Sequence, residues 1–189
     1  MKYNPKTNER QAAQPGFAAA HPMLPPNLSQ GILKLMYDLE RFLVEITGMD
    51  AATIQPAAGA HGELAGMLLF YAYHRSQGSP RSKIIVPDTA HGTNPASAAL
   101  CGYRPVPIKS NEKGVLAPED VAAVMDEETA GIMVTNPNTL GLFEDNIKKI
   151  ADIVHAKGGL VYGDGANMNA VMGIVHMGAI GIDVLHLNL

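Results

Sequence analysis

The sequence predicts an α/β fold, in which a doubly wound and mostly parallel sheet lies between two layers of helices. From residue 83 onward, short apolar runs alternate with helical patterns, which is typical of right-handed βαβ units. Several of these runs are apolar along their whole length, as expected for strands covered on both faces. The chain has 189 residues, 47% of them hydrophobic and 17% charged, so it can bury a substantial core. We therefore expect a three-layer αβα domain.

The first part of the chain differs from the rest. Residues 1–28 carry five prolines and little periodicity, which favours an extended arm lying over a neighbouring surface. Residues 29–189 are expected to form one large domain. Its first helix should be capped by Ser29 and end at Gly48, with one apolar stripe at helical spacing. That stripe comprises Ile32, Leu35, Met36, Leu39, Phe42, Leu43 and Ile46.

Further elements follow from the same patterns. A second helix is expected to begin near residues 61–63 and end near Gly78, with Leu64, Met67, Leu68 and Tyr71 on its apolar face. Two more helices are expected, one from Pro118 to about Met125 and one ending at Gly158. Five strands are predicted, at residues 83–87, 104–108, 131–135, 160–164 and 183–189.

Charge and cysteine content exclude several classes of protein. The net charge is −4 and no long basic run occurs, so we expect neither a nucleic-acid partner nor an anionic membrane surface. No apolar run approaches the ~20 residues that span a bilayer. The single Cys101 cannot form an internal disulfide, which fits a reducing, cytoplasmic setting. A free cysteine is more often a small buried residue than a nucleophile.

Polar residues follow the predicted strands at one edge of the sheet, where ligands bind in open α/β folds. The run LVYGDGAN at residues 160–167 places Asp164 at the end of a buried strand. A carboxylate there is costly to bury unless something binds it, which suggests a cofactor with a basic nitrogen that must stay protonated. The alternatives are a helix cap or an ion pair with a lysine. Other polar groups follow at residues 88–94 and 135–141, and at His186 and Asn188.

Two further features are open to more than one interpretation. The small residues in the run QPAAGAHGE at residues 55–63 fit a strand-to-helix turn that binds phosphate, or simply a tight turn with a helix cap. His91 fits either a ring that stacks on a planar ligand or a structural hydrogen-bonding group. A metal site made from His61, His91 and Asp164 is conceivable, but no ligand spacing supports it, so no metal is predicted.

Four long runs carry a specific resemblance. They are MKYNPK at residues 1–6, DTAHGTNPAS at 88–97, TNPNTLGLFE at 135–144 and YGDGANMNA at 162–170. In this order they resemble the glycine dehydrogenase (decarboxylating) family, the P-proteins of the glycine cleavage system, and within it subunit 2 of the two-subunit bacterial type. The resemblance covers essentially the whole chain. It implies an incomplete large domain of the fold-type I transferases that depend on pyridoxal 5′-phosphate.

The resemblance also implies roles for individual residues. Asp164 would pair with the pyridinium nitrogen and His91 would stack on the ring, which makes these two the expected catalytic residues. The phosphate would lie at the helix start. Thr135 and Asn136 would contact the ring or the substrate. The remaining expected cofactor contacts are Ala60, His61, Asn167 and Asn188.

The implied reaction is the decarboxylation of glycine, after which the aminomethyl group passes to the lipoyl arm of the H-protein. The implied partners are that protein and P-protein subunit 1, in an oligomer. In that family the strand that here ends at Leu189 leads into His-Lys-Thr, so the domain is expected to stop before the Schiff-base lysine and to be inactive alone. The alternatives are another fold-type I enzyme, similar to a cysteine desulfurase or an aminotransferase, and a non-catalytic α/β domain that binds a partner. The run TNPNTLG favours the glycine cleavage branch.

Overall fold

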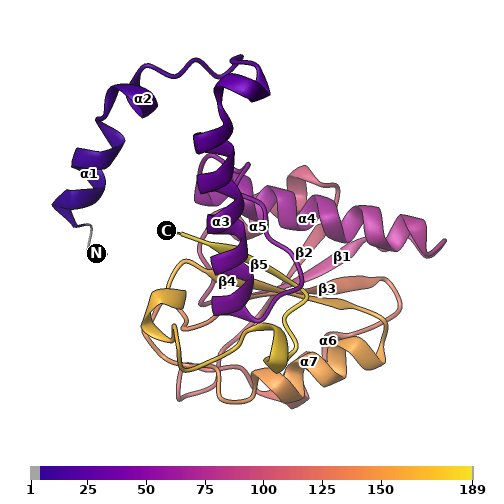
Figure 1. Cartoon of the computed structure of the whole chain (residues 1–189). Coiled ribbons are helices and arrows are strands. Elements are labelled where there is room, and N and C mark those ends of the chain that lie inside the picture. Colours follow the sequence, from indigo (N-terminus) through magenta and orange to yellow (C-terminus); the bar gives the residue numbers. More distant parts are fainter. Residues whose placement is uncertain (1–4, 189) are drawn as a thin grey trace.

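The computed structural model describes residues 5–188 and centres on a five-stranded sheet (Figure 1). All strand pairs are parallel, and the strand order is β2-β1-β3-β4-β5. The strands are β1 (Lys83–Pro87), β2 (Arg104–Ile108), β3 (Thr129–Thr135), β4 (Leu160–Gly165) and β5 (Val184–Leu187). All five predicted strands are therefore present, although β3 begins two residues before its predicted start. Residues 1–4 and Leu189, which include part of the first resemblance motif, lie outside the described residues.

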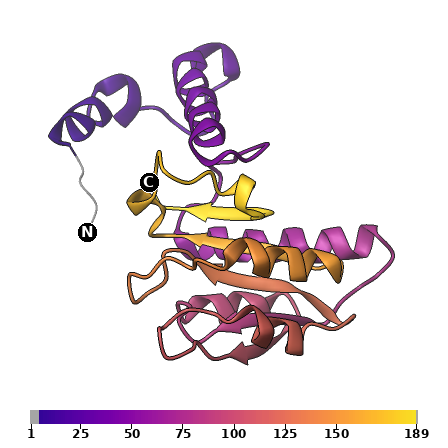
Figure 2. The same cartoon turned by 90° about the horizontal axis from the view of Figure 1, so that it is seen from below.

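Helices cover both faces of the sheet, which confirms the predicted three-layer arrangement (Figures 1 and 2). Helices α4 (Gly59–Ser76) and α5 (Thr93–Leu100) pack on one face. Helices α6 (Pro118–Val124) and α7 (Ile147–Ala156) lie on the other. Helix α5 was not expected, because its run of alanines carries no apolar stripe that periodicity could detect.

Helix α4 buries a different face from the one predicted. Leu68 and Tyr71 are 51% and 40% exposed, whereas the buried positions are Glu63, Gly66, Met67, Phe70 and His74. Gly66 explains the choice of face: a Cβ there would lie 2.6 Å from the ring of Tyr162 on β4. At Gly66 the helix therefore comes close to β4, and a count of apolar residues does not detect such a close approach. Met67, which was part of the predicted face, is buried as expected.

The N-terminal segment is helical in part and not extended as predicted. It contains α1 (Lys6–Ala12), α2 (Pro15–Ala18) and the 3₁₀ turn η1 (Pro26–Leu28), none of which has a buried residue. These elements stand away from the sheet in Figures 1 and 2. That the segment lies over a neighbouring surface stays a prediction.

Helix α3 (Gln30–Thr47) follows the predicted bounds and ends at Gly48, whose φ of 67° suits glycine. The expected capping bond from Ser29 is absent, because its hydroxyl group donates instead to the Pro25 carbonyl at 3.3 Å. Only Leu43 of the predicted stripe is buried, and Phe42 is 63% exposed. Two 3₁₀ turns, η2 (Met168–Ala170) and η3 (Gly178–Ile180), complete the described elements. No helix between residues 5 and 188 combines the length and the apolar character needed to cross a membrane.

His74 makes the stability of this fold dependent on pH. Its side chain is 2% exposed, and Nε2 lies 2.8 Å from the Ala130 carbonyl oxygen. Burial lowers the pKa of His74; the bond to Ala130 opposes this effect and the charge of Arg81 adds to it. As pH falls below the unfolded-state value of about 6.5, the unfolded chain takes up a proton that the folded chain resists. The free energy of unfolding should therefore fall between pH 7 and pH 5.

The His74→Gln variant tests this prediction, because glutamine can donate to Ala130 without titrating. Urea unfolding midpoints at pH 7 and pH 5 should differ less for His74→Gln than for the original chain. His21→Gln, at an exposed histidine, is the matched control and should keep the original difference. Equal differences in all three proteins would show that His74 is not responsible.

Candidate functional site

The candidate site lies at the carboxyl edge of the sheet, where three neighbouring strands form a row of polar side chains. Thr135 on β3 is the register partner of Asp164 on β4, and Asp164 is the partner of His186 on β5. Register partners in a parallel sheet project from the same face, here the face covered by α4. All three residues are at most 8% exposed. The predicted convergence of strand-end polar groups is therefore present.

Asp164 is a buried carboxylate held mainly by neutral donors. Its Oδ2 accepts bonds from Asn94 Nδ2 at 3.3 Å and from the Thr135 hydroxyl at 3.4 Å. Its Oδ1 accepts the Ala166 backbone N–H at 3.0 Å. No lysine or arginine between residues 5 and 188 forms an ion pair with Asp164. The alternative interpretation, an ion pair between Asp164 and a lysine, is therefore not supported, and the carboxylate suits a cationic ligand.

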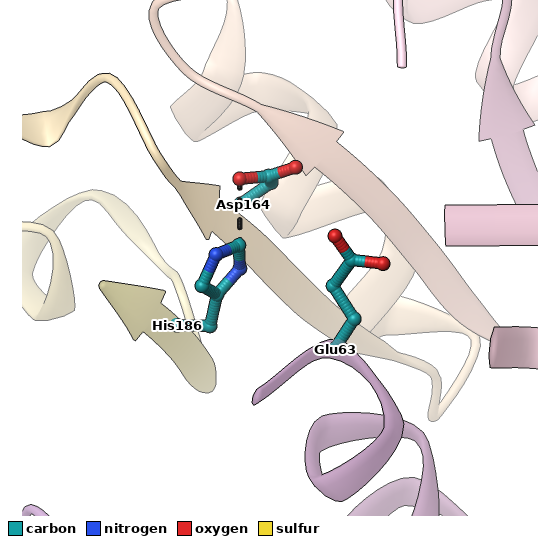
Figure 3. Close-up of side chains that lie close together, drawn as sticks. All are labelled: Glu63, Asp164 and His186. Carbon is teal, nitrogen blue, oxygen red and sulfur yellow. Dashed lines mark ion pairs between the residues drawn. The ribbon is translucent and has the colours of Figure 1, made fainter. Parts of the chain in front are cut away.

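His186 is the one ionisable side chain paired with Asp164 among the described residues. Its Nδ1 lies 3.5 Å from Asp164 Oδ1 (Figure 3). The same nitrogen lies 2.7 Å from the hydroxyl group of Tyr162. Burial, followed by the charges of Asp164 and Glu63, raises the pKa of Tyr162, so its phenol stays protonated and can donate to His186. The contact between His186 and Asp164 becomes an ion pair only if His186 is protonated.

A second buried carboxylate, Glu63, extends from α4 toward this row (Figure 3). The ligand-type atoms of Glu63, Asp164 and His186 all lie within 4.8 Å of one another. This is the group in the described residues that could hold a metal, and it differs from the trio of His61, His91 and Asp164 considered from the sequence. Because Glu63 accepts bonds from the hydroxyl groups of Thr93 and Ser97, its charge is stabilised within the protein.

His91 lies between β1 and α5, with its side chain exposed. Its Nδ1 lies 2.6 Å from Thr93 Oγ1, and that hydroxyl lies 2.7 Å from Glu63 Oε1. Glu63 in turn neighbours Asp164, so His91 belongs to the same edge as the row. An exposed ring face held at one nitrogen suits stacking on a planar ligand.

The loops after β1 and β3 meet beside this row. Chain connections leave β1 and β3 in opposite directions across the sheet, and such a switch point is the usual ligand crevice. The Thr139 hydroxyl joins the two loops by donating to the Thr89 carbonyl at 2.7 Å. Asn136 Oδ1 accepts the Glu144 N–H at 3.1 Å. Asn167 donates to the Pro137 carbonyl at 3.1 Å, a contact that holds the loop.

Two polar atoms beside the row are buried without a hydrogen-bond partner, Asn94 Oδ1 and Asn136 Nδ2. Buried polar atoms are rarely left unpaired, so each favours a ligand group at this edge. The Asp164 carboxylate has no lysine or arginine partner among the described residues. Together with this carboxylate, the two unpaired atoms fit a ring that carries both a protonated nitrogen and polar substituents.

The start of α4 carries Ala60 and His61, both exposed. Residue Ala58 precedes the helix with extended backbone, and no side chain caps the first turn. The backbone N–H of His61 donates to the Ala58 carbonyl at 3.0 Å, so the N–H groups of this 18-residue helix that suit an anion are those of Gly59 and Ala60. The expected strand before this turn is absent, because residues 51–56 have no regular structure.

A cavity of 520 Å³ lies beside β5, the last strand in the sheet order. Residues 51–54, the α4 residues Gly59 and Gly66, and β5 line it. Of the predicted site residues only Asn188 lines this cavity, and Asp164 and His91 do not. The cavity nevertheless reaches the row, because His186 and the α4 residues Gly59 and Gly62 are also among its lining residues.

Comparison with known proteins decides the family. Residues 61–188 match the aminotransferase class-V family, which is more than half of the chain. The chain belongs to the aminotransferase class-V family. The match begins in the first turn of α4 and extends past the end of β5, the strand that carries His186. Enzymes of this family have the fold-type I architecture and depend on pyridoxal phosphate.

Individual relatives within the aminotransferase class-V family confirm the resemblance. "Probable glycine dehydrogenase (decarboxylating) subunit 2" of Chloroherpeton thalassium is 56% identical over 189 residues, which are 100% of this chain and 38% of the relative. The protein of the same name from Bacillus cytotoxicus is 58% identical over 190 residues, covering 39% of its length. The chain thus spans about two fifths of the relatives that it matches.

A solved structure supports the fold of this aminotransferase class-V chain. The crystal structure of glycine decarboxylase (P-protein) of the glycine cleavage system, in inhibitor-bound form, superposes with a TM-score of 0.81. The alignment has 23% identity and covers 97% of this chain and 40% of the other. At this identity the match shows the fold alone.

Four residues of the site were not among the predicted site residues: Glu63, Thr93, Asn94 and His186. Thr93 and Ser97 are four positions apart, and their hydroxyl groups both reach Glu63. This spacing would have been informative had α5 been recognised as a helix, since positions i and i+4 share a face. Asn94 Nδ2 reaches Asp164 only through tertiary packing.

Proposed function

We propose that this chain forms the ring-binding part of a pyridoxal 5′-phosphate-dependent glycine decarboxylase of the glycine cleavage system. The observation that carries the proposal is Asp164, a carboxylate that is 2% exposed, held by neutral donors and placed at the carboxyl edge of β4. The names of the relatives, which contain the words glycine dehydrogenase (decarboxylating), indicate glycine as the substrate. When bound, the cofactor would supply an electron sink for the electrons released as carbon dioxide leaves an amino acid.

Each residue would then have a distinct task. Asp164 would hold a proton on the ring nitrogen, because a buried carboxylate strongly favours a cationic partner. His91 would lie against the ring face and fix its plane. Thr135 donates to Asp164 and so keeps that carboxylate in place. Asn136, whose Nδ2 has no partner, would donate to a polar group on the ring or the substrate.

The helix start would bind the phosphate group. Ala60 and His61 belong to the first turn of α4, where the helix dipole favours an anion. Ala60 would contribute its backbone N–H, whereas His61, whose N–H donates to Ala58, would contribute its exposed side chain. Asn188 and Asn167 stand further from this chemistry: Asn167 holds the loop at Pro137, and Asn188 lines the cavity beside β5. We propose them as supporting contacts.

The proposal extends to partners and location. Glycine would be the substrate, and the lipoyl arm of the H-protein would receive the aminomethyl group. Exposed apolar side chains on α3 and α4, such as Phe42 and Leu69, suit an oligomer with P-protein subunit 1. The single thiol, Cys101, fits the cytoplasm.

Titration of the 189-residue chain with pyridoxal phosphate tests the cofactor assignment. We expect reversible binding, with no single lysine labelled stoichiometrically after borohydride reduction and peptide mapping. Three of the lysines are remote from the site: Lys83 is at the amino end of β1, paired with Asp126 and Glu128, and Lys148 and Lys149 are on α7 across the sheet. Lys109 follows the carboxyl end of β2, an edge strand separated from β4 by β1 and β3. Stoichiometric labelling of one lysine would contradict the assignment of residues, and absence of binding by both this chain and the complete protein would contradict the cofactor.

The substrate needs a separate assay in the complete decarboxylase. Exchange of labelled bicarbonate into the carboxyl group of glycine, with subunit 1 and lipoylated H-protein present, should exceed exchange into alanine. A preference for cysteine or for an amino-group acceptor would instead favour another fold-type I enzyme. Absence of all of these activities would favour a non-catalytic binding domain.

A further inference from the structure

Glu63 is a buried titratable group to which the proposed function gives no task. Its side chain is 4% exposed, yet the carboxylate lies at the carboxyl edge of the sheet (Figure 3). Burying a carboxylate without a cation is unfavourable, and α4 could place an apolar residue here as it does at Met67 and Phe70. The burial of a carboxylate at this position therefore suggests that Glu63 has a role in the site.

The contacts of Glu63 lead to His91 through one hydroxyl group. Thr93 Oγ1 lies 2.7 Å from Glu63 Oε1 and 2.6 Å from His91 Nδ1. Ser97, one turn further along α5, brings its hydroxyl to 3.5 Å from the second carboxylate oxygen. Glu63 thus contacts two hydroxyl groups on one face of α5, and only the first continues to the histidine.

Donor and acceptor roles in this chain follow from elementary chemistry. An ionised carboxylate can only accept, so the Thr93 hydroxyl proton must point to Glu63. The lone pairs of that oxygen then face His91, which must supply a proton from Nδ1. The Thr93 backbone N–H also lies 3.3 Å from His91 Nδ1, which would require Nδ1 to accept. The 2.6 Å contact is much the shorter, and it fits the ionised carboxylate.

We propose that Glu63 is a positioning residue that acts through Thr93 to keep His91 in the tautomer with its proton on Nδ1. The ring then has one fixed plane, because its Nδ1–H is directed at Thr93. Its Nε2 carries the lone pair and no proton. The importance of this arrangement for cofactor binding rests on the proposed function, whereas the tautomer itself does not.

The tautomer can be measured directly by ¹⁵N NMR of the histidine rings, because protonated and unprotonated ring nitrogens differ widely in chemical shift. The spectra are recorded at a pH of about 8.5, two units above the ordinary histidine value, so that they report the ratio of the two neutral tautomers. We expect the Nδ1–H form to predominate in the original chain. In Glu63→Gln the amide can donate to Thr93 Oγ1 as well as accept from it, so the hydroxyl proton is no longer fixed toward residue 63. The ratio of the Nδ1–H form to the Nε2–H form should then fall about tenfold, which corresponds to about 1.4 kcal/mol.

Three further variants make the test specific. Thr93→Val keeps the shape but removes the hydroxyl group and should lower the ratio as Glu63→Gln does, whereas Thr93→Ser restores the hydroxyl and should preserve it. Glu45→Gln, at an exposed position on α3, is the matched control and should have no effect. An unchanged ratio in both Glu63→Gln and Thr93→Val would overturn the proposal, as would a predominant Nε2–H form in the original chain.

A second readout connects the tautomer to the cofactor. Pyridoxal phosphate affinity, measured by absorbance, should fall about threefold in Glu63→Gln and in Thr93→Val, but not in Thr93→Ser. If the tautomer shifts and the affinity does not, the inferred link between Glu63 and the cofactor is wrong. If the original chain and the complete protein both fail to bind the cofactor, the proposed function is wrong, while the tautomer result still stands.

Discussion

Replacing Asp164 with asparagine in the complete decarboxylase is expected to lower glycine turnover by about 100-fold or more. Asparagine keeps the shape of the side chain but removes the negative charge that would hold a proton on the ring nitrogen. Removing one partner of a buried ion pair costs about 3–5 kcal/mol, and each 1.4 kcal/mol corresponds to a factor of ten. The absorbance of the bound cofactor should also change, because the ring nitrogen would no longer be protonated.

The same substitution separates function from folding. In the chain without cofactor, Asp164 is a buried charge surrounded by neutral donors, so Asp164→Asn should leave the urea midpoint unchanged or raise it. Asp152→Asn, an exposed carboxylate on α7, is the matched control and should change neither property. Turnover within threefold of normal for Asp164→Asn, with full cofactor content, would show that Asp164 does not have the proposed role.

Replacing Gly131 with alanine is expected to destabilise the fold by about 4 kcal/mol or more. Gly131 is in the middle of β3 with φ at 158°, and a Cβ there would lie 1.9 Å from the Leu160 carbonyl oxygen of β4. That atom is backbone in a paired strand, so it cannot rotate away as a side chain could. The Phe70 ring of α4, 2.8 Å from the same position, closes the other route of relief.

Because β3 and β4 carry Thr135 and Asp164 as register partners, the same strain should disturb the site. Urea unfolding followed by circular dichroism measures the loss of stability. Gly31→Ala is the matched control, since a Cβ on Gly31 in α3 meets nothing within 4 Å. It should be neutral or stabilising by up to about 1 kcal/mol. A Gly131→Ala chain as stable as the Gly31→Ala chain would show that the two strands can separate at low cost.

The parallel sheet was predictable because its strands are apolar on both faces and alternate with helical patterns. The face of α4 that packs on the sheet could not be predicted from the apolar pattern. Leu68 and Tyr71 are apolar yet exposed, while Gly66 and Glu63 are buried. Apolar periodicity indicates which residues leave water on folding. It does not indicate where a helix can approach a strand closely, as Gly66 allows α4 to do beside Tyr162.

The candidate site also contains some residues that the sequence indicated and others that it did not. Asp164 and His91 were identifiable because polar residues at strand ends and a specific resemblance both indicate them. Glu63 was not identified, and Asn94 and His186 were placed at this edge of the sheet without a role. Their contacts join α4, α5 and β5 across long distances in the chain. Helix α5 has no apolar stripe, so the sequence did not predict that Thr93 and Ser97 lie on one face of a helix.

The amino-acid sequence alone determined the fold class and the order of the strands along the chain, because these depend on local composition and spacing. The roles proposed for Asp164 and His91 came from the family resemblance and stay predictions. The tertiary structure alone decided which strands are neighbours and in what register. That register places Thr135, Asp164 and His186 in one row and brings Glu63 beneath it. The reason is physical: packing between distant segments fixes distances between side chains, and a linear pattern contains no such distances.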